Sequence, residues 1–352
     1  MGAIEKNNGK RYSQGLGKAF RWLGFAALAL FGLLAVGLLT GFTAEKWIEL
    51  RDKRLYPPPG RMTETGNGRR HMFCEGRGAP TVVQITGNGI PAVLIRPLQD
   101  RVAKYSHVCI YDRAGLGWSE PAIRPINIAG QADELHKILA ANGERGPFIM
   151  TGHSYGGLIA RQYLKDNPHT VAGIVLVDSG EEGEVFQAKA LKGVAAAVSQ
   201  SERSERLARF GLLRALVAID PSAASYSPHL TDAERREANA LILRPSFYHC
   251  VAVELTQGYD NTPPAMQKAG GFGTLGTLPL VVIRHGQPFA GSDAWREEGW
   301  QKAQVRLAAL SSDSRLMTAA RDGHNIIVDN PDLVSSAIHD VVTAVRERRK
   351  LN

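Results

Sequence analysis

The sequence predicts an α/β protein, with a mostly parallel sheet of eight strands flanked by helices, a helical insertion, and a transmembrane helix before the sheet. Three observations lead to this prediction. Short apolar runs alternate with helix-like stretches from about residue 61 onward, residues 181–277 lack such runs, and residues 22–42 contain no charged side chain. Alternation of this kind is typical of parallel sheets that are covered by helices.

The composition is that of a globular protein and limits the classes of partner. Hydrophobic residues make up 44% of the chain and charged residues 22%, which excludes a disordered chain. The formal net charge is +8, and part of this excess of basic residues lies in residues 1–21 and in "RERRK" at 346–350. No basic stripe with interleaved aromatic residues indicates nucleic-acid binding. The charge distribution instead favours contact with an anionic membrane surface.

Residues 22–42, "WLGFAALALFGLLAVGLLTGF", are long enough to span a bilayer as a helix. At about 1.5 Å per residue the segment reaches roughly 30 Å, the thickness of the hydrocarbon core. A cleaved signal peptide and a buried core helix are the alternatives. Signal peptides have a shorter apolar stretch, and Phe42 does not suit their small-residue cleavage pattern. We therefore expect a signal anchor between a basic segment, residues 1–21, and a linker, residues 43–60.

The orientation of this anchor depends on the basic residues at its two ends. Lysine and arginine residues flank the apolar segment almost equally, so the positive-inside comparison is nearly balanced. We favour a cytoplasmic N-terminus with the main domain outside the cytoplasm. "YPPPG" at 56–60 then acts as a stiff spacer between anchor and domain.

The main domain is expected to consist of a core, residues 61–180 and 278–352, and a helical cap, residues 181–277. The first two strands form a hairpin around Gly66-Asn67-Gly68. Within the cap, residues 202–219 have a helical pattern. The expected strands are 61–65, 69–75, 81–85, 107–111, 148–150, 173–177, 278–283 and 314–319.

Helical patterns separate most of these strands, as in residues 127–141. The last helix is expected to begin at Asn330-Pro331, because asparagine caps helices and proline suits their first turn. The three cysteines do not form a disulfide framework, and no cysteine or histidine spacing indicates zinc.

A serine lies between glycines in "GHSYG" at 152–156, where an apolar run ends and a helical pattern begins at once. A strand that leads directly into a helix forces a tight turn, which the flanking glycines permit. Such a turn raises the Ser154 hydroxyl above the sheet, at a helix N-terminus where the positive potential favours an oxyanion. A purely structural turn is the alternative. The surroundings favour a catalytic nucleophile.

Four segments together resemble the α/β-hydrolase superfamily, and within it serine esterases and lipases of the bacterial membrane-anchored and secreted types. The resemblance covers about residues 60–350 and implies the α/β-hydrolase fold. The segments correspond to the oxyanion turn after the third strand, the loop after the fourth strand, the nucleophile elbow and the histidine loop. They are "VVQITGNG" (82–89), "YDRAGLGWSEP" (111–121), "TGHSYGG" (151–157) and "DGHNIIVDNPDLV" (322–334).

The resemblance implies roles for four residues. Ser154 is the nucleophile, and His324, in the loop after the last strand, is the base that accepts its proton. The backbone N–H groups of Tyr155 and Asn88 are the oxyanion donors. The sequence departs from the family at the oxyanion turn, where Thr86-Gly87 replaces the usual His-Gly.

The acid of the triad stays open at this stage. The family usually places it after the seventh strand, where the first carboxylate is Asp293, or at the end of the sixth strand, where "LVDSG" contains Asp178. The chain order Ser, Asp, His holds for both residues. We favour Asp178, with Asp293 as the alternative and Glu181 or Glu182 after it.

Other residues near these motifs are expected to have structural roles. His285, after the seventh strand, is a poor candidate for the base by its order in the chain. Asp112 and Arg113 are expected to form an ion pair beneath the active-site loops. If the resemblance holds, the second and fourth strands are neighbours, so Cys74 and Cys109 can approach each other and form a disulfide.

The activity implied is hydrolysis of an ester or related acyl bond, with lipid-like esters as candidate substrates and no metal or organic cofactor. A nucleophilic serine argues against dehalogenases and epoxide hydrolases, which resemble this fold but use aspartate. Dinucleotide binding is not expected, because Gly115-x-Gly117 lacks a third glycine. The alternatives are an aminopeptidase or amidase, a C–C bond hydrolase of the same fold, and an anchored binding protein with a vestigial site.

Overall fold

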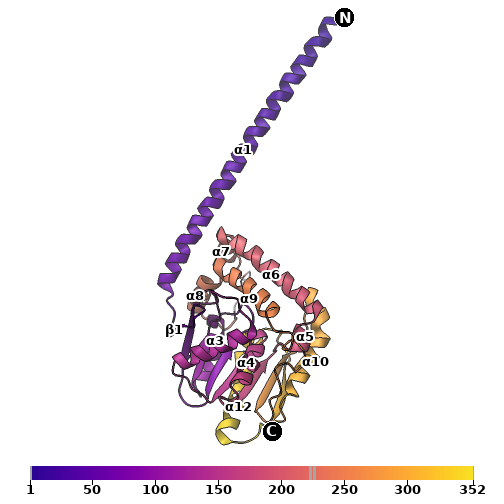
Figure 1. Cartoon of the computed structure of the whole chain (residues 1–352). Helices are drawn as coiled ribbons and strands as arrows, with labels where there is room; N and C mark the ends of the chain where they lie inside the picture. The colour runs from indigo at the N-terminus through magenta and orange to yellow at the C-terminus, as the bar shows by residue number, and fades with distance from the viewer. Residues whose placement is uncertain (1, 222–223, 225–226, 269, 352) are drawn as a thin grey trace.

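The computed structural model of the chain describes residues 2–351 apart from 222–223, 225–226 and 269, with side chains from residue 21 onward apart from 292–293. Its main body is a sheet covered by helices, from which one long helix projects (Figure 1). The strands are β1 (Arg61–Glu64), β2 (Arg69–Glu75), β3 (Thr81–Ile85), β4 (Val108–Tyr111), β5 (Phe148–His153), β6 (Val171–Val177), β7 (Leu280–His285) and β8 (Ser314–Ala319).

The strand order confirms the predicted fold class. The sheet has eight strands in the order β1-β2-β4-β3-β5-β6-β7-β8. The β1–β2 and β2–β4 pairs are antiparallel, and the remaining pairs are parallel. Cys74 on β2 lies directly opposite Cys109 on β4, and the two sulfurs form a disulfide.

Successive side chains of a strand point to opposite faces of a sheet, and both faces of this sheet are buried. Val83 and Met150 contact one apolar cluster, whereas their neighbours Val82 and Ile149 contact another. The first face is covered by α3 (Ile128–Ala141), α4 (Tyr155–Asp166) and α10 (Glu297–Ala308), and the second by α2 (Arg96–Ala103), α11 (Ile326–Asp329) and α12 (Pro331–Glu347).

The helices of the core begin where the sequence has capping residues. The Asn127 side chain accepts a hydrogen bond from Gly130 N at the start of α3, and the Asn330 side chain caps α12 ahead of Pro331. These side chains satisfy N–H groups that the first helical turn leaves free.

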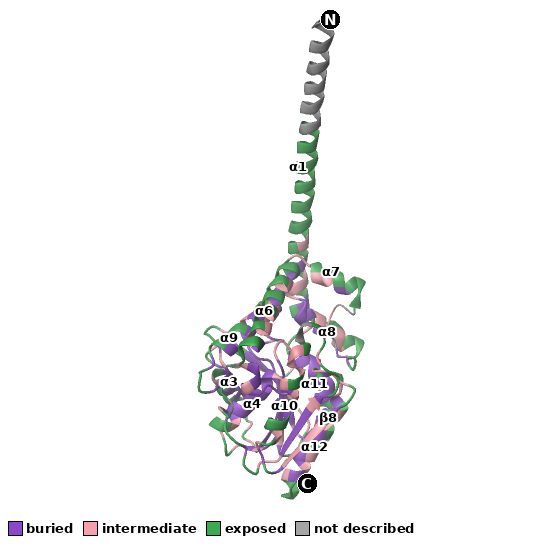
Figure 2. Ribbon diagram, turned by 90° about the vertical axis from the view of Figure 1, so that its right-hand side faces the viewer, coloured by how far each residue is buried: buried purple, intermediate pink, exposed green. Residues whose placement is uncertain are grey.

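The cap consists of helices, as expected, but its central segment is two helices rather than one. The predicted helix 202–219 is divided at Gly211, whose φ of 70° lies in the left-handed region that glycine tolerates. The cap helices are α5 (Glu182–Val185), α6 (Ala188–Arg209), α7 (Leu212–Ile219), α8 (Asp232–Ile242) and α9 (Pro245–Asp260). They lie over one edge of the sheet, between the core and the long N-terminal helix (Figures 1 and 2).

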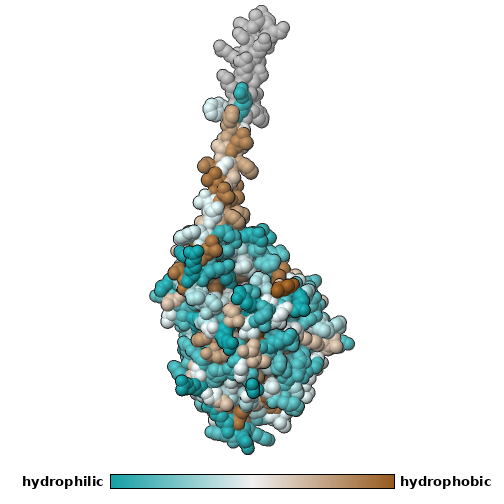
Figure 3. Space-filling view, turned by 60° about the vertical axis from the view of Figure 1, so that its left-hand side comes forward, coloured by the Kyte–Doolittle hydropathy of each residue, from teal (hydrophilic) through white to brown (hydrophobic). Residues whose placement is uncertain are grey.

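The long helix α1 (Gly2–Leu55) includes the predicted anchor and continues through most of the predicted linker. From Arg21 it is long and apolar enough to cross a membrane, by length and composition, and its apolar stretch is exposed (Figure 2). Figure 3 shows these apolar side chains above a domain whose visible surface is mainly hydrophilic. Arg214 of α7 holds α1 to the cap through Glu45 at 2.9 Å and Asp52 at 3.1 Å.

Candidate active site

Ser154 alone separates β5 from α4, and its backbone is strained. Its φ of 51° and ψ of −120° are unusual for a residue with a side chain. The turn depends on its glycines. A Cβ on Gly156 would lie 2.3 Å from the carbonyl oxygen of Ile85, and a Cβ on Gly152 would lie 2.6 Å from the Cα of Gly157. The absence of these Cβ atoms therefore lets strand and helix meet closely enough to present Ser154 at the sheet edge.

The structure brings Ser154, His324 and Asp178 together in a hydrogen-bonded chain. Ser154 Oγ lies 3.0 Å from His324 Nε2, and His324 Nδ1 lies 2.6 Å from Asp178 Oδ2. Asp178 follows the last residue of β6 and is fully buried, whereas the side chain of His324 is 28% exposed. The three residues come from the carboxyl ends of β5 and β6 and from the loop after β8, and this edge of the sheet faces the cap.

The other carboxylates considered from the sequence are not placed in this chain of hydrogen bonds. Glu181 forms an ion pair with Arg306 at 2.5 Å, and Glu182 forms one with Arg161 at 2.6 Å. The side chain of Asp293 lies outside the described residues. Of the described candidates for the acid, only Asp178 contacts His324.

His285 is a second histidine on the same carboxylate. Its Nδ1 lies 2.7 Å from Asp178 Oδ2, and its Nε2 lies 3.0 Å from Glu297 Oε2. Burial acts to lower the pKa of His285, but the hydrogen bonds to Asp178 and Glu297 outweigh it and raise that pKa. Sequence reasoning gave His285 a structural role and missed its contact with the acid. The available signal was that Asp178 and His285 lie at the ends of β6 and β7, which are neighbours in the sheet.

Asp178 therefore remains ionised although it is buried. Burial on its own raises the pKa of a carboxyl group. The hydrogen bonds from His285 and His324, together with their charges, hold the pKa of Asp178 well below its usual range. A charged carboxylate beside His324 Nδ1 fixes the orientation of that imidazole and stabilises its protonated form.

His153 connects the elbow to the histidine loop. Its side chain is buried, and Nε2 donates to the backbone carbonyl of His324 at 2.9 Å. Burial lowers the pKa of His153 to about 3, so the ring is neutral near pH 7. This hydrogen bond fixes the backbone of the loop that presents His324. The histidine that contacts Ser154 Oγ is His324.

The turn after β3 lies directly against the nucleophile. A Cβ on Gly87 would lie 3.0 Å from the Cβ of Ser154. Arg113 holds this turn, because its guanidinium donates to the carbonyls of Thr86 and Gly87, each at 2.7 Å. The same guanidinium forms a buried ion pair with Glu254 of α9, at 2.5 Å from Nε. A residue of the cap thus positions the turn beside Ser154.

Asn88, the predicted second oxyanion donor, lies in this turn and lines the cavity that contains Ser154. Its side chain accepts a hydrogen bond from Tyr259 Oη at 3.2 Å and donates to Glu254 at 3.3 Å. Gly89 N also donates to Glu254, at 3.2 Å. These bonds fix the turn and occupy the amide oxygen and nitrogen of the Asn88 side chain.

The expected Asp112–Arg113 ion pair is wrong. The Asp112 carboxylate contacts His71 Nδ1 at 2.8 Å and accepts a hydrogen bond from Ala92 N at 2.7 Å. Arg113 instead reaches Glu254. Asp112 and Arg113 are adjacent residues directly after β4, and their side chains point in different directions. The partner of Arg113, Glu254, is 141 residues away in the sequence, so no local pattern indicated this ion pair.

The cavity above Ser154 has a volume of about 360 Å³. Polar and apolar side chains both line it, and the cap supplies many of the apolar ones from α6 and α9. Arg296 is the cation of this wall, and its guanidinium lies over the rings of Phe289 at 5.1 Å and Trp300 at 4.9 Å. The apolar lining residues are Ile90, Val185, Ala190, Val194, Ala197 and Leu255.

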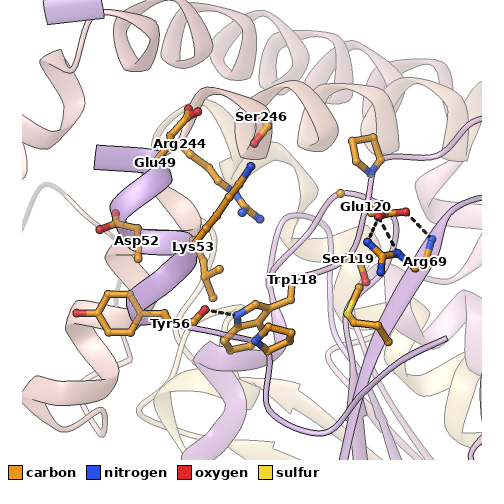
Figure 4. A pocket seen from close by; sticks show the side chains of 16 residues that line it. Glu49, Asp52, Lys53, Tyr56, Arg69, Trp118, Ser119, Glu120, Arg244 and Ser246 are labelled. Carbon is orange, nitrogen blue, oxygen red and sulfur yellow. Dashed lines mark hydrogen bonds and ion pairs between the residues drawn. The ribbon is translucent and has the colours of Figure 1, made fainter. Parts of the chain in front are cut away.

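A larger cavity of about 560 Å³ lies at the junction of α1, the loop after β4 and the cap, and it does not include Ser154 (Figure 4). Trp118 donates from Nε1 to the carbonyl of Tyr56 at 3.0 Å beside it, and Arg69 pairs with Glu120 on its other side. Although this cavity is larger than the one above Ser154, no triad residue lines it, so it is not the candidate reactive site.

Two clusters of described side chains have ligand atoms close enough to hold a metal ion. In the first, Cys74 and Cys109 are joined to each other beside His107 and Glu144. In the second, Asp178 lies between His285 and His324, and its Oδ2 already accepts a hydrogen bond from each ring. Neither cluster needs a metal to satisfy these polar atoms.

Comparison with known proteins agrees with the fold. The family model described as the α/β-hydrolase fold matches residues 72–224. The protein YqjL of Bacillus subtilis (strain 168) is 24% identical over 267 residues, which cover 76% of this chain and 85% of YqjL. An esterase from Thermogutta terrifontis superimposes with a TM-score of 0.55 at 16% identity, over 81% of this chain and 99% of the esterase.

A loop variant of the haloalkane dehalogenase DbeA from Bradyrhizobium elkanii superimposes with a TM-score of 0.59 at 15% identity, over 82% of this chain and 97% of that protein. The resemblance found in the sequence is therefore confirmed. The chain has the α/β-hydrolase fold, which esterases and dehalogenases share, and residues 72–224 match the model of that family.

Proposed function

We propose that the chain is a membrane-anchored serine hydrolase that cleaves carboxylic esters through Ser154, His324 and Asp178. The single observation that carries this proposal is the continuous hydrogen-bonded chain from Ser154 Oγ through His324 to Asp178, with distances of 3.0 Å and 2.6 Å. The geometry matches the roles of nucleophile, base and acid.

In the first half of the proposed reaction, His324 Nε2 accepts the hydroxyl proton while Ser154 Oγ attacks the ester carbonyl. The resulting oxyanion is held by the backbone N–H groups of Tyr155, at the start of α4, and of Asn88. Each such donor lowers the barrier by about 3 kcal/mol. The oxyanion collapses, the bond to the leaving alkoxide breaks, and His324 returns its proton to that alkoxide. An acyl-serine and an alcohol result.

In the second half, water attacks the acyl-serine. His324 accepts the proton of the water, the same N–H groups hold the second oxyanion, and the proton passes to Ser154 Oγ as the carboxylic acid leaves. Asp178 stays ionised throughout and stabilises the imidazolium that forms in both halves. His285 and Glu297 are positioning residues, because His285 contacts Asp178 and Glu297 holds His285, and neither acts on the substrate.

A serine at the elbow favours acyl transfer over the chemistry of dehalogenases, whose nucleophile is an aspartate. The apolar side chains that the cap places in the wall of the cavity favour substrates with an apolar acyl group, and lipid-like esters fit this description. The apolar stretch of α1 supports attachment to a membrane, and the Cys74–Cys109 disulfide supports a domain outside the cytoplasm, because such bonds persist in oxidising compartments.

The choice of acid is tested by replacing each aspartate separately in the full chain. Asp178→Asn is expected to reduce kcat for an ester by about ten-thousand-fold, because the amide stabilises the wrong tautomer of His324. Asp293→Asn is expected to retain the wild-type kcat within a few-fold. Turnover of a series of p-nitrophenyl esters of graded chain length measures both the effect and the substrate preference. Loss of turnover only in the Asp293 variant would overturn the assignment of Asp178.

A further inference from the structure

The cap helix α7, "LLRALVAI", is apolar on more than one side, yet much of it faces outward. Leu212, Leu216 and Ile219 are 48%, 50% and 84% exposed, and their spacing places them on one face of the helix. Val217, by contrast, is buried against the rest of the cap. Exposed large apolar side chains gathered on one helix indicate a surface that meets another apolar medium.

The contact between the cap and α1 places this helix relative to the apolar segment. A Cβ on Gly41 would lie only 2.4 Å from the carbonyl oxygen of Phe210, in the turn between α6 and α7. Gly41 is next to the last residue of the apolar segment 22–42. If that segment spans the hydrocarbon core of about 30 Å, the turn lies at its boundary with the headgroups. Figures 1 and 2 show α7 on the side of the domain from which α1 emerges.

The charged residues around α7 favour a bilayer over a protein partner. Arg203 and Arg206 of α6 are exposed, Arg209 of the same helix pairs with Glu205, and Arg214, the charged residue of α7, is held by Glu45 of α1. Exposed arginines beside an apolar helix face are typical of elements that lie in the interface of an anionic membrane.

A cavity of about 360 Å³ lies directly behind α7, lined on that side by Leu213, Leu216 and Val217. Ile90 and Asn325 line both this cavity and the cavity above Ser154. The two cavities therefore adjoin at Ile90 and Asn325, one behind the outer helix of the cap and the other above the triad.

From these observations we infer that α7 lies in the interface of the membrane that α1 spans, and that the cavity behind it admits the acyl chain of a bilayer lipid ester to Ser154. The second part of this inference rests on the proposed ester hydrolysis. The first part rests only on the proposed membrane span. The occupant of the exposed face of α7 is thus the lipid bilayer itself.

The membrane contact is tested without reference to catalysis, on the full chain in nanodiscs of phosphatidylcholine and phosphatidylglycerol. A nitroxide label is attached to Ile219→Cys, and to Ile123→Cys as the matched control. Ile123 is 77% exposed and lies beside Asn67 of the β1–β2 hairpin. Cys250 is buried, and burial raises its pKa to about 11, so it does not compete for the label.

The label at position 219 is expected to be accessible to oxygen and shielded from an aqueous nickel complex. The label at position 123 is expected to be more accessible to the nickel complex than to oxygen. Equal nickel accessibility at both positions would overturn the inference. Shielding of position 219 from both reagents would overturn it as well, because that result indicates a protein surface against α7.

The route to the triad is tested with Leu212→Glu/Ile219→Glu, and with Ile123→Glu as control. The double variant is expected to hydrolyse a long-chain ester held in the nanodisc about tenfold more slowly, since charged side chains leave the interface. Its turnover of a water-soluble acetate ester is expected to match the wild type. Equal losses with both substrates would contradict the lipid route. Absence of all turnover in the wild type would count against the proposed function and would leave the label experiment decisive for α7.

Discussion

At the scale of single residues, the candidate site depends on one buried carboxylate that two histidines share. Asp178 accepts a hydrogen bond from His324 at 2.6 Å and from His285 at 2.7 Å. His285 is held in turn by Glu297, so the orientation of the base depends on a chain of residues from three elements. The sequence indicated Ser154, His324 and Asp178, because each follows a recognisable strand. It did not indicate Glu297, which only the fold brings near.

The raised pKa of His285 predicts a specific pH dependence of stability. Protonated His285 between two carboxylates stabilises the folded state fully below its unfolded pKa of about 6.5, and this stabilisation is lost as the pH rises through the raised folded pKa. The lowered pKa of Asp178 acts in a different window, because its contribution is lost only as the pH falls below about 4.

The prediction is tested with His285→Asn and urea unfolding between about pH 5.5 and about pH 9. The variant is expected to lose about 3 kcal/mol of unfolding free energy at the acidic end, where the wild type has the charged pair. The difference between the two proteins should shrink as the pH rises. A difference that stays constant over this range would show that protonation of His285 does not contribute.

At the scale of elements, the turn between β5 and α4 could be predicted from the sequence, because it depends on the glycines that flank Ser154. The break of the cap helix at Gly211 was missed, since a single glycine within a helical pattern is a weak signal on its own. The continuation of α1 to Leu55 was also missed. The segment after residue 42 is polar, and its helical state is stabilised by Arg214 of α7, which is distant in the sequence.

The elbow gives a prediction at this scale. Gly156→Ala is expected to reduce the free energy of unfolding by about 3 kcal/mol and to abolish ester turnover, because the new methyl group meets backbone atoms of β3. Gly193→Ala is the matched control: Gly193 lies within α6 with open space around its Cα, so alanine is expected to raise stability by up to about 1 kcal/mol. Thermal unfolding measures the stability of both variants, and an ester assay measures the turnover of Gly156→Ala. An equal change in the two variants would contradict the steric account of the elbow.

At the scale of the whole molecule, the cap and the core act on the same turn. Glu254 of α9 pairs with Arg113, and Arg113 holds the carbonyls of Thr86 and Gly87 beside Ser154. The sequence predicted where the strands and the cap lie along the chain, because hydrophobic periodicity is local. It could not predict which cap residue reaches the core, because this depends on how α9 packs over the sheet edge.

The central claim is that Ser154 is an activated nucleophile, and covalent labelling of the full chain with a fluorophosphonate probe tests it most directly. Ser199, exposed on α6, provides the matched control. The account predicts one phosphonylated residue, located at Ser154 by mass spectrometry, with full labelling of Ser199→Ala and none of Ser154→Ala. A wild-type protein that stays unlabelled, or a Ser154→Ala variant that labels like the wild type, would contradict it.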